Sequence, residues 1–445
     1  MIGSLSRTTA GANRTAMPAP AAAALAAYVL VTIGSCLRGH VLLILGVPLT
    51  IAGFAVAWLP AAGAGTGRGE WPVSRIALSL SALAAVGVAS PPMQGAWWYE
   101  TAERVYFGLA IVLIGVFAAA DTAGRRRATN VLIAGAVALQ IVAPLGIHPV
   151  VDLWSWTDTC TRALLHGVHP YTVRAADLQR GGFDYGSTPT VYPYMPLTLL
   201  ASAPWVALQG DYRFGLACCL PATLVMVRAA GRRLAVDAAI VDVMTLALAL
   251  HPLAPAITGT GYVEPFLVAV SAGFFLSAVI APRGYGEAIG FLLLPAIKQY
   301  VAAPALLYAA MRGRPRTIAT GAAVAAATVA PFLLWNWRPT IDGILFFART
   351  PPAFRVDSDS AAAIAAALTG VEAPAALPII TQFAVAALAC RRLRDRGLAG
   401  LLLASALSLL ASFLVAPQAF TNYYYFAGAL LVLSALAAAR PEQSG

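Results

Sequence analysis

Apolar runs long enough to cross a bilayer recur along the whole chain. Candidate crossings lie near 19–36, 41–60, 74–90, 105–121, 129–147, 212–229, 236–251, 262–281, 317–335, 374–390, 398–415 and 424–439. The runs are continuous rather than alternating, which is typical of membrane helices and not of a β-barrel. Since one crossing takes about 20 residues, the pattern predicts an all-α polytopic membrane protein with about 12 transmembrane helices.

One apolar segment, 192–208, does not fit a simple crossing. It contains Pro193, Pro196 and Pro204, and proline interrupts a helix by removing a donor and clashing with the preceding turn. If it crossed the bilayer, every later basic loop would change sides. We therefore expect a short or re-entrant segment, and a broken helix rather than a clean span.

A second irregular segment is FLLLPAIKQYVAAPALLYAA, residues 291–310, flanked by Arg283 and Arg312. Both arginines fit the same side of the membrane, so the segment enters and leaves on that side. The pattern predicts two half-length helices that turn near Lys298–Gln299. Broken backbone at membrane depth is tolerated where it lines a cavity or is buried in protein.

The long polar stretch 148–190 divides the chain. We expect a single membrane domain made of N-terminal helices (1–147), an outer loop with the re-entrant segment (148–211) and C-terminal helices (212–445). Within the loop, residues 152–166 predict an amphipathic surface helix that ends at Gly167. Leu153, Trp154, Trp156, Cys160, Ala163 and Leu164 would face the membrane, with both Trp in the interfacial belt.

Charge sets the expected orientation. The 445 residues include 29 Lys and Arg against 19 Asp and Glu, for a net charge of +10, with 60% hydrophobic residues, and the mean hydropathy is +0.76. Arginine clusters occupy alternate loops, at 125–127, 228–233, 312–316 and 391–396, so these loops and both termini are expected in the cytoplasm. The positive charge therefore indicates membrane orientation and not a nucleic-acid partner. The Ala- and Arg-rich composition is typical of a bacterial protein, so we expect a plasma-membrane protein.

Two carboxylates in the outer loop are candidates for chemistry. Asp152 stands where the fifth crossing ends and the surface helix begins, which suits either a helix cap or a general base at the membrane boundary. Asp158 and Arg162 are four residues apart and predict an exposed ion pair on one helix face. Spacing alone leaves both interpretations of Asp152 open.

Lys298 is the only lysine in the chain. It stands in the middle of an apolar hairpin, where an ionisable group is costly and usually functional. Its side chain either extends to the interface or binds an anion, for which phosphate is the simplest choice.

Three further clusters fall at the expected outer side. The segment ARTPPAFRVDSDS (348–360) carries Arg349 and Arg355, and APQAFTNYYYF (416–426) carries Asn422 and a run of tyrosines. The tyrosines suit interfacial anchors or, with the amide, a hydroxyl-rich ligand. Glu264 at a helix start is either a cap or a second acid. No cluster has metal-ligand spacing and no nucleotide motif is present, so no cofactor is expected.

Together these motifs resemble a known family. The order is Asp152, ALLHGVHPY, YPYMP, KQ, an R-x-DS-x-S loop and NYY, ending at Tyr424. It resembles the polyprenol-phosphate-dependent glycosyltransferases of the GT-C superfamily, in particular the family-87 (DUF2029) mannosyltransferase-like proteins. The resemblance implies a GT-C-like fold and inverting transfer of a sugar, mannose by analogy, from a polyprenyl-phosphate donor to a glycolipid or glycan acceptor of the cell envelope, on the outer face.

The resemblance also implies residue roles. Asp152 is the base, with Asp158 as the fallback. Donor phosphate binding falls to Lys298, Arg349, Arg355, Gln299, Tyr423, Tyr424 and Asn422, and acceptor or sugar contacts to His169, Tyr171, Tyr192, Tyr194 and Glu264.

One departure and one alternative accompany it. About five apolar segments precede the Asp loop here, where the family pattern has one or so. The alternative function is a flippase or transporter of lipid-linked sugars, in which Lys298 and Glu264 bind the ligand at membrane depth. The absence of inverted repeats from the sequence counts against it.

Overall fold

The computed structural model describes residues 16–36, 48–49, 51–53, 55–56, 71–89, 95–149, 151–178, 189–350, 352, 354–355 and 358–441. The predicted crossing at 41–60 lies largely outside these residues, so the structure does not test it. The described chain consists of helices and loops, with one short antiparallel strand pair, β1 (Ala16–Met17) with β2 (Trp71–Pro72), and an isolated antiparallel bridge between Gly95 and Ile147.

Each of the other predicted crossings corresponds to a helix. These helices are α1 (Ala19–Cys36), α3 (Val73–Ala89), α4 (Trp97–Ala119), α5 (Thr122–Gly146), α8 (Arg213–Arg233), α9 (Ala238–Ala249), α11 (Glu264–Ile280), α15 (Pro315–Ile344), α18 (Leu377–Leu393), α19 (Gly397–Val415) and α20 (Thr421–Ala438). The shorter helices are α6 (Asp152–Leu165), α7 (Pro196–Gln209), α10 (Ala254–Thr260), α12 (Tyr285–Leu292), α13 (Leu294–Ile297), α14 (Ala302–Met311), α16 (Phe346–Arg349) and α17 (Ala361–Thr369), with 3-10 turns η1 (Pro170–Thr172), η2 (Ala175–Asp177), η3 (Gln299–Val301) and η4 (Arg394–Arg396).

By length and composition, seven helices of the described chain could span a membrane, or up to eight if α9 and α10, bent by 42°, form one span. One of the seven ranges, Leu377–Val415, contains both α18 and α19. The prediction of a polytopic helical membrane protein is therefore confirmed. The predicted number of about 12 spans is not reached among the described residues, partly because helices such as α11, with 17 residues, are short.

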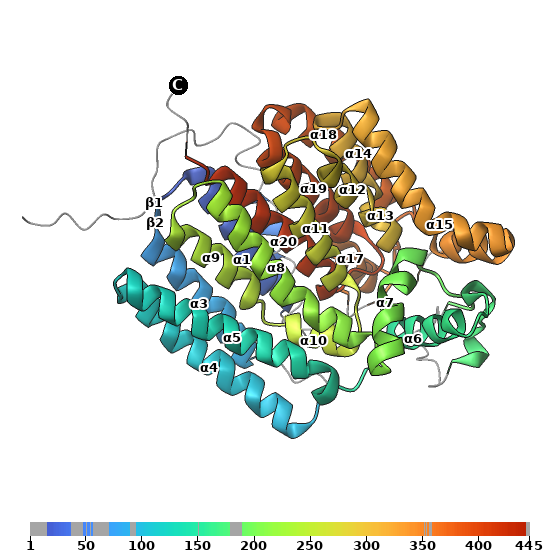
Figure 1. Ribbon diagram of the computed structural model, residues 1–445, viewed down its shortest axis with the longest axis horizontal. Coiled ribbons are helices and arrows are strands. Elements are labelled where there is room, and N and C mark those ends of the chain that lie inside the picture. Colours follow the sequence, from blue (N-terminus) through green and yellow to red (C-terminus); the bar gives the residue numbers. More distant parts are fainter. Residues whose placement is uncertain are drawn as a thin grey trace, which may run out of the picture.

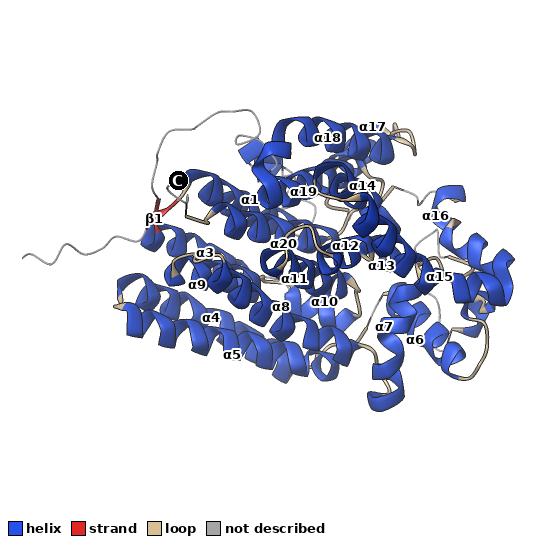
Figure 2. Ribbon diagram, turned by 45° about the horizontal axis from the view of Figure 1, so that its top comes forward, coloured by secondary structure: helices blue, strands red, loops and turns tan. Residues whose placement is uncertain are grey.

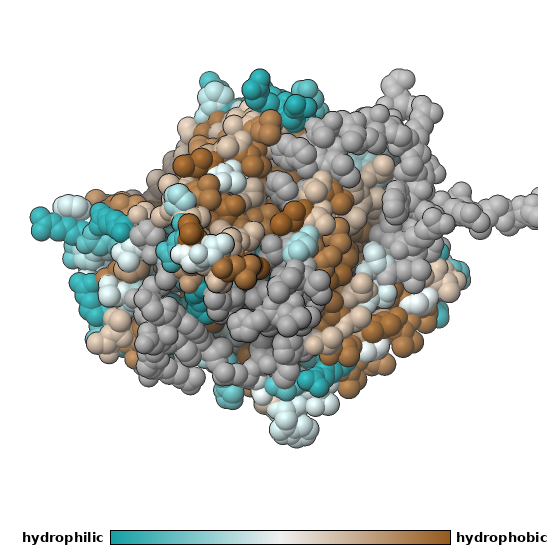
Figure 3. Space-filling model, turned by 180° about the vertical axis from the view of Figure 1, so that it is seen from behind, coloured by the Kyte–Doolittle hydropathy of each residue, from teal (hydrophilic) through white to brown (hydrophobic). Residues whose placement is uncertain are grey.

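The helices form one bundle whose centre is α20 (Figure 1). α20 is buried along almost its whole length and packs against α1, α19, α11 and α9. α3, α4 and α5 lie on one side of it, and α12, α14, α15 and α18 lie on the other. α4 by contrast exposes Val105, Leu109 and Val112, and apolar side chains spread over much of the described rear face (Figure 3). An apolar core inside an apolar surface is what a bilayer requires.

The predicted pair of half-length helices is present. α12 and α13 run up to Lys298, whose backbone is extended (φ −143°, ψ 135°), and η3 and α14 lead away from it. At the base, the Arg312 guanidinium binds the Glu287 carboxylate, with Nε–Oε1 at 2.5 Å and Nη2–Oε2 at 3.1 Å. Because Glu287 lies in the first turn of α12 and Arg312 just after α14, this ion pair closes a hairpin with Lys298 at its tip.

The segment 192–208 is short, as predicted, but its helix is not broken. α7 has 14 residues, begins with Pro196 and continues through Pro204 as one helix. Pro196 fits because the first helical position needs no backbone donor. Pro193 precedes the helix, in the stretch that leads into it.

The predicted surface helix is present as α6 with nearly the expected bounds. Its apolar face, however, is covered by protein, where the prediction had the membrane. Gly167 follows it in a left-handed conformation (φ 73°). Trp156 is fully buried, in a cluster with Cys160, Tyr171 and Tyr192, and Ser155 and Asp158 on the predicted polar face are buried too. α7 and the η1 turn pack against α6, so the fully buried Trp156 is a core residue and not a membrane anchor.

Candidate functional site

A buried ion pair lies where the tip of the hairpin meets the start of α11. The Lys298 ammonium is 2.5 Å from the Glu264 Oε1 atom, and both side chains are almost wholly buried. The Tyr300 hydroxyl donates to the same oxygen at 3.2 Å. Glu264 Oε2 is buried and has no hydrogen-bond partner among the described residues. One oxygen of this buried carboxylate is therefore paired and the other is not.

Three tyrosine rings surround the Lys298 ammonium. Its nitrogen lies 4.9 Å from the ring centre of Tyr423, 5.5 Å from that of Tyr300 and 5.8 Å from that of Tyr194. Such contacts stabilise a cation through the negative faces of the rings, by about 0.5–2 kcal/mol each. The Lys298 side chain is thus enclosed by protein, which argues against the interpretation that it extends to the interface.

Asp152 is within electrostatic reach of the Lys298 ammonium. It is the first residue of α6, after Val151 in the capping position, and its Oδ1 accepts the Leu153 N–H at 2.7 Å. Burial raises the pKa of this carboxyl group, while the Leu153 hydrogen bond and the charges of Lys298 and Arg355 oppose the rise. The carboxylate thus lies near two of the predicted cations, and it does not make the bond to the second or third N–H that defines a helix cap.

Asp158 has a structural partner set instead. Its carboxylate accepts two bonds from Arg162, at 2.8 and 3.2 Å, and Arg162 also donates to the Gly210 carbonyl. The pair was predicted as exposed, but the Asp158 side chain is 6% exposed and that of Arg162 is 37% exposed. Burial raises the pKa of Asp158 and the Arg162 bond opposes this. Asp158 is committed to this ion pair.

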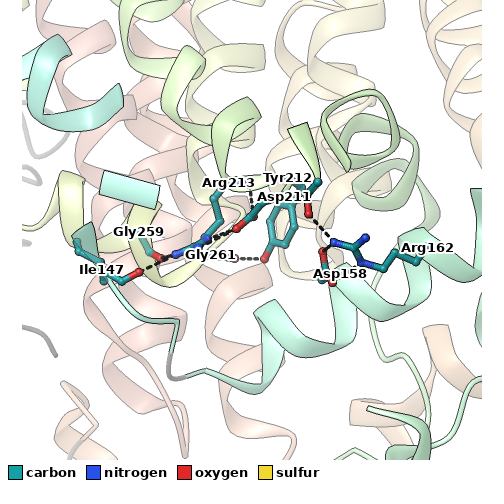
Figure 4. Close-up of polar contacts among 9 residues, drawn as sticks. Ile147, Asp158, Arg162, Asp211, Tyr212, Arg213, Gly259 and Gly261 are labelled. Carbon is teal, nitrogen blue, oxygen red and sulfur yellow. Dashed lines mark hydrogen bonds and ion pairs between the residues drawn. The ribbon is translucent and has the colours of Figure 1, made fainter. Parts of the chain in front are cut away.

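This ion pair continues into a network that fixes the start of α11 (Figure 4). Arg213 binds Asp211 and donates to the carbonyls of Ile147, at 2.8 Å, and Gly259, at 2.5 Å. The Tyr212 hydroxyl donates to the Gly261 carbonyl at 2.5 Å. Gly261 has a left-handed φ of 91° and lies three residues before Glu264. The network therefore ties α6, α8 and the end of α5 to the turn that positions Glu264.

The HPY and YPYMP motifs bind to each other and to α15, and we call this arrangement the clamp. His169 Nε2 lies 3.2 Å from the Phe332 carbonyl of α15, to which it donates. The Tyr171 hydroxyl donates to the Tyr194 carbonyl at 2.7 Å, and Tyr192 is fully buried beside Tyr171. Of the four residues expected to contact sugar or acceptor from these motifs, only Tyr194 faces Lys298.

Gln299 completes the clamp. Its side-chain nitrogen donates to the Pro193 carbonyl at 2.9 Å and to the Ile344 carbonyl at 3.2 Å. The tip of the hairpin is thereby tied to the YPYMP segment and to the end of α15. Gln299 thereby helps to position its neighbour Lys298, and its role in phosphate binding stays a prediction.

Gly343 shows how closely α15 approaches this clamp. A Cβ atom there would lie 2.4 Å from the Tyr192 carbonyl oxygen and 2.5 Å from the Tyr171 ring. We expect Gly343→Ala to lower the free energy of unfolding by about 1–3 kcal/mol, the usual cost of overpacking. Gly108→Ala is the control, since a Cβ at Gly108 in α4 meets nothing within 4 Å. The measurement is the thermal midpoint of both variants, and equal midpoints would contradict the clamp.

The remaining candidate residues lie in the loop before α17 and in the first turn of α20, and their contacts differ. The Tyr424 hydroxyl donates to the Asp359 carbonyl at 2.6 Å, so this tyrosine anchors the loop and only Tyr423 faces Lys298. Asn422 is buried and its Oδ1 has no partner in the described chain. The Arg355 guanidinium lies 5.0 Å from the Phe420 ring centre and close enough to act on Asp152.

Arg349 does not join the cluster. It pairs with Asp342 at 2.5 Å, and the two side chains are 55% and 59% exposed. The prediction that it binds the donor phosphate has no support in this arrangement. Tyr300 was missed by the sequence analysis although it follows the KQ motif directly, and the Asp211–Arg213 network was missed because its partners are backbone carbonyls distant in sequence.

The comparisons with known proteins add no further assignment. No protein-family model, no curated protein and no solved structure matches this chain. In the described part of the chain, no group of three or more His, Cys, Asp and Glu side chains is arranged to hold a metal ion. The site is therefore defined by its own geometry. In it a buried lysine is paired with one carboxylate, lies within electrostatic reach of a second and is surrounded by three tyrosine rings.

Proposed function

We propose that the chain is an inverting glycosyltransferase that takes a sugar from a polyprenyl-phosphate donor. The observation that carries the proposal is the position of Lys298 at the tip of a broken hairpin, beside Glu264 and three tyrosine rings and within electrostatic reach of Asp152. A cation in a water-poor site stabilises the phosphate that departs as the leaving group. The motif order from Asp152 to Tyr424 supports the same reaction class.

In this mechanism Asp152 removes the proton from an acceptor hydroxyl as it attacks the anomeric carbon. The bond from that carbon to the phosphate oxygen breaks, and the polyprenyl phosphate leaves with its electron pair. Lys298 stabilises the negative charge that develops on the phosphate. Arg355 adds a second positive charge within electrostatic reach of Asp152. Tyr194 and Tyr423, whose ring faces turn to Lys298, line the sugar site, as aromatic side chains commonly do in ligand pockets.

The alternative, transport of a lipid-linked sugar, has one observation in its favour. Broken helices and buried ion pairs at depth are features of transporters as well. Transport leaves the ligand chemically unchanged, so it needs neither a base nor a leaving-group site.

The test is a transfer assay on the purified full chain in detergent. Radiolabelled polyprenyl phosphomannose is mixed with cell-envelope lipids, and the expected result is label in a new product together with free polyprenyl phosphate. Label that stays in the donor, combined with movement of the donor across liposomes, would favour transport and contradict the proposal. The proposed orientation, with the site outside the cell and both termini inside, is tested by labelling single cysteines at 175 and 395 with an impermeant thiol reagent.

A further inference from the structure

The helix α15 is too long for one straight crossing of a bilayer. It has 30 residues, which extend about 45 Å at 1.5 Å per residue, whereas the hydrocarbon core is about 30 Å thick. The backbone of Asn336 is not helical (φ −158°, ψ 99°) and divides α15 into two helical parts. The first part, residues 315–335, has the length of one crossing. The break at Asn336 therefore falls where the chain reaches the membrane boundary.

The break in α15 is encoded by the sequence. Pro339 has no N–H to donate to the Trp335 carbonyl four residues before it, so the helical hydrogen bonds are interrupted there. The Thr340 hydroxyl lies 2.8 Å from the Asn336 carbonyl oxygen and 3.1 Å from that of Phe332. The carbonyl groups beside the break thus find a donor within the chain, and the kink is a fixed feature of the fold.

Residues 337–349, which we call the arm, follow the break. The arm comprises the last part of α15 and α16, and it lies at the edge of the bundle beside α6 and α7 (Figure 2). One side of it packs against protein, where Thr340 and Gly343 are buried. Arg338 and Asp342 are exposed and four residues apart, so they share one helix face. Arg349 pairs with Asp342, which extends this charged face to the end of the arm.

A second face of the arm is apolar. Trp337, Ile341 and Ile344 are spaced by four and three residues, so they lie on one side of the helix. Trp337 is 58% exposed, and the two isoleucines are partly exposed. The apolar face continues the surface of the first part of α15, where Leu334 is 88% exposed. A short helix with a charged face and an apolar face that continues a bilayer-facing surface is typical of an interfacial segment.

Exposed tryptophans mark the level of the arm independently. Trp335 and Trp337 flank the break and are 48% and 58% exposed. Trp97 and Trp98, in the first turn of α4, are 80% and 40% exposed. Both pairs lie on one side of the membrane, because α4 ends and α15 begins at an arginine-rich loop. They are the only exposed tryptophans among the side chains that the structure describes, and tryptophan at helix ends is enriched at the membrane–water interface.

We propose that the arm lies along the membrane surface, with Trp337 and its apolar face in the lipid and Arg338 and Asp342 in water. The partner is therefore the headgroup region of the bilayer. The Gln299 side chain donates to the Ile344 carbonyl of the arm at 3.2 Å, so the arm also sets the depth of the hairpin tip and places Lys298 near the headgroup level. The proposal rests on the geometry of the arm and does not depend on the proposed function.

The experiment measures the depth of nitroxide spin labels on the full chain in phosphatidylcholine liposomes, from their accessibility to oxygen and to a water-soluble nickel complex. The labels are attached to Trp337→Cys and Asp342→Cys in a background in which Cys218 and Cys390 are alanine, because the other three cysteines are buried. We expect the label at 337 about 5–10 Å below the headgroup boundary and the label at 342 in water.

Leu109→Cys is the matched control for depth. Leu109 is 56% exposed near the middle of α4, a helix that could span the membrane, so its label should lie near the bilayer centre. All three variants replace exposed side chains, and we expect each to keep the thermal midpoint of the background.

Three results would overturn the proposal. Equal accessibility of the labels at 337 and 342 to the nickel complex would place the arm in water. A label at 337 as deep as the one at 109 would show that α15 crosses as one tilted span. Magnetic coupling between the 337 labels of two chains would show that a second copy of the protein, and not lipid, covers the apolar face.

Discussion

Asp152→Asn gives a folded protein that binds polyprenyl phosphate and transfers sugar about 10²–10⁴ times more slowly than wild type, the usual effect of losing a positioned base. Asparagine keeps the shape of the side chain and can still accept the Leu153 N–H, so the first turn of α6 is preserved. It cannot remove a proton. The measurement is the single-turnover transfer rate, with the thermal midpoint recorded on the same sample.

The control is Asp158→Asn, which separates catalysis from the integrity of the loop. Asp158 is buried against Arg162 in the network that fixes the start of α11, so we expect a lower thermal midpoint and only an indirect loss of rate. If Asp158→Asn is inactive at an unchanged midpoint while Asp152→Asn is active, the assignment of the base is wrong.

The pH dependence follows from the same residue. A base must be ionised, and burial raises the pKa of Asp152, so the rate rises with pH through a value above the ordinary pKa of about 3.9 for aspartate. Arg355→Gln removes a charge that lowers this pKa, so the acid limb of the kcat profile should move to higher pH. In terms of stability the sign is opposite: because the folded-state pKa is raised, protonation of Asp152 stabilises the fold as pH falls through it.

Lys298→Met abolishes detectable binding of polyprenyl phosphate and also destabilises the protein, by about 3–5 kcal/mol. The second effect arises because Glu264 is fully buried and loses the ammonium that neutralises it. A loss of binding in this variant alone would therefore be ambiguous.

The double variant Lys298→Met with Glu264→Gln resolves the ambiguity. It removes both charges of the buried pair, so most of the lost stability should return while phosphate binding stays absent. Binding is measured by displacement of a fluorescent polyprenyl phosphate, and stability by thermal unfolding. Wild-type affinity in the double variant would show that Lys298 is structural and would remove the main support for the proposed function.

The sequence predicted the helices well because a continuous apolar run in a bilayer can satisfy its own backbone hydrogen bonds only as a helix. The hairpin with Lys298 at its tip was also predicted, because the flanking residues Arg283 and Arg312 both fit the same side of the membrane. The burial of α6 in protein was not predicted. An amphipathic pattern shows that one face of a helix is covered, but it does not show whether lipid or protein covers that face. Trp156 suits a membrane interface and a protein core equally well until α7 is placed against it.

Within the site, the sequence located the charged groups and not their partners. Lys298 and Asp152 stand out because ionisable side chains are rare in this chain, whereas the pairing of Lys298 with Glu264 joins residues 34 positions apart. His169 and Gln299 were expected to touch ligand but bind backbone carbonyls. Carbonyl partners leave no mark in an amino-acid sequence, and this is also why the Arg213 network was missed.

The hairpin around Lys298 has a consequence for biosynthesis. At its tip, Lys298 binds Glu264, which is 34 residues earlier in the chain. Gln299 donates to the Ile344 carbonyl, which is 45 residues later. Until α15 has been synthesised, one acceptor of Gln299 is missing. The contacts of the hairpin tip are therefore completed only after the following helix has been made, so that the tip reaches its final structure later than its own translation.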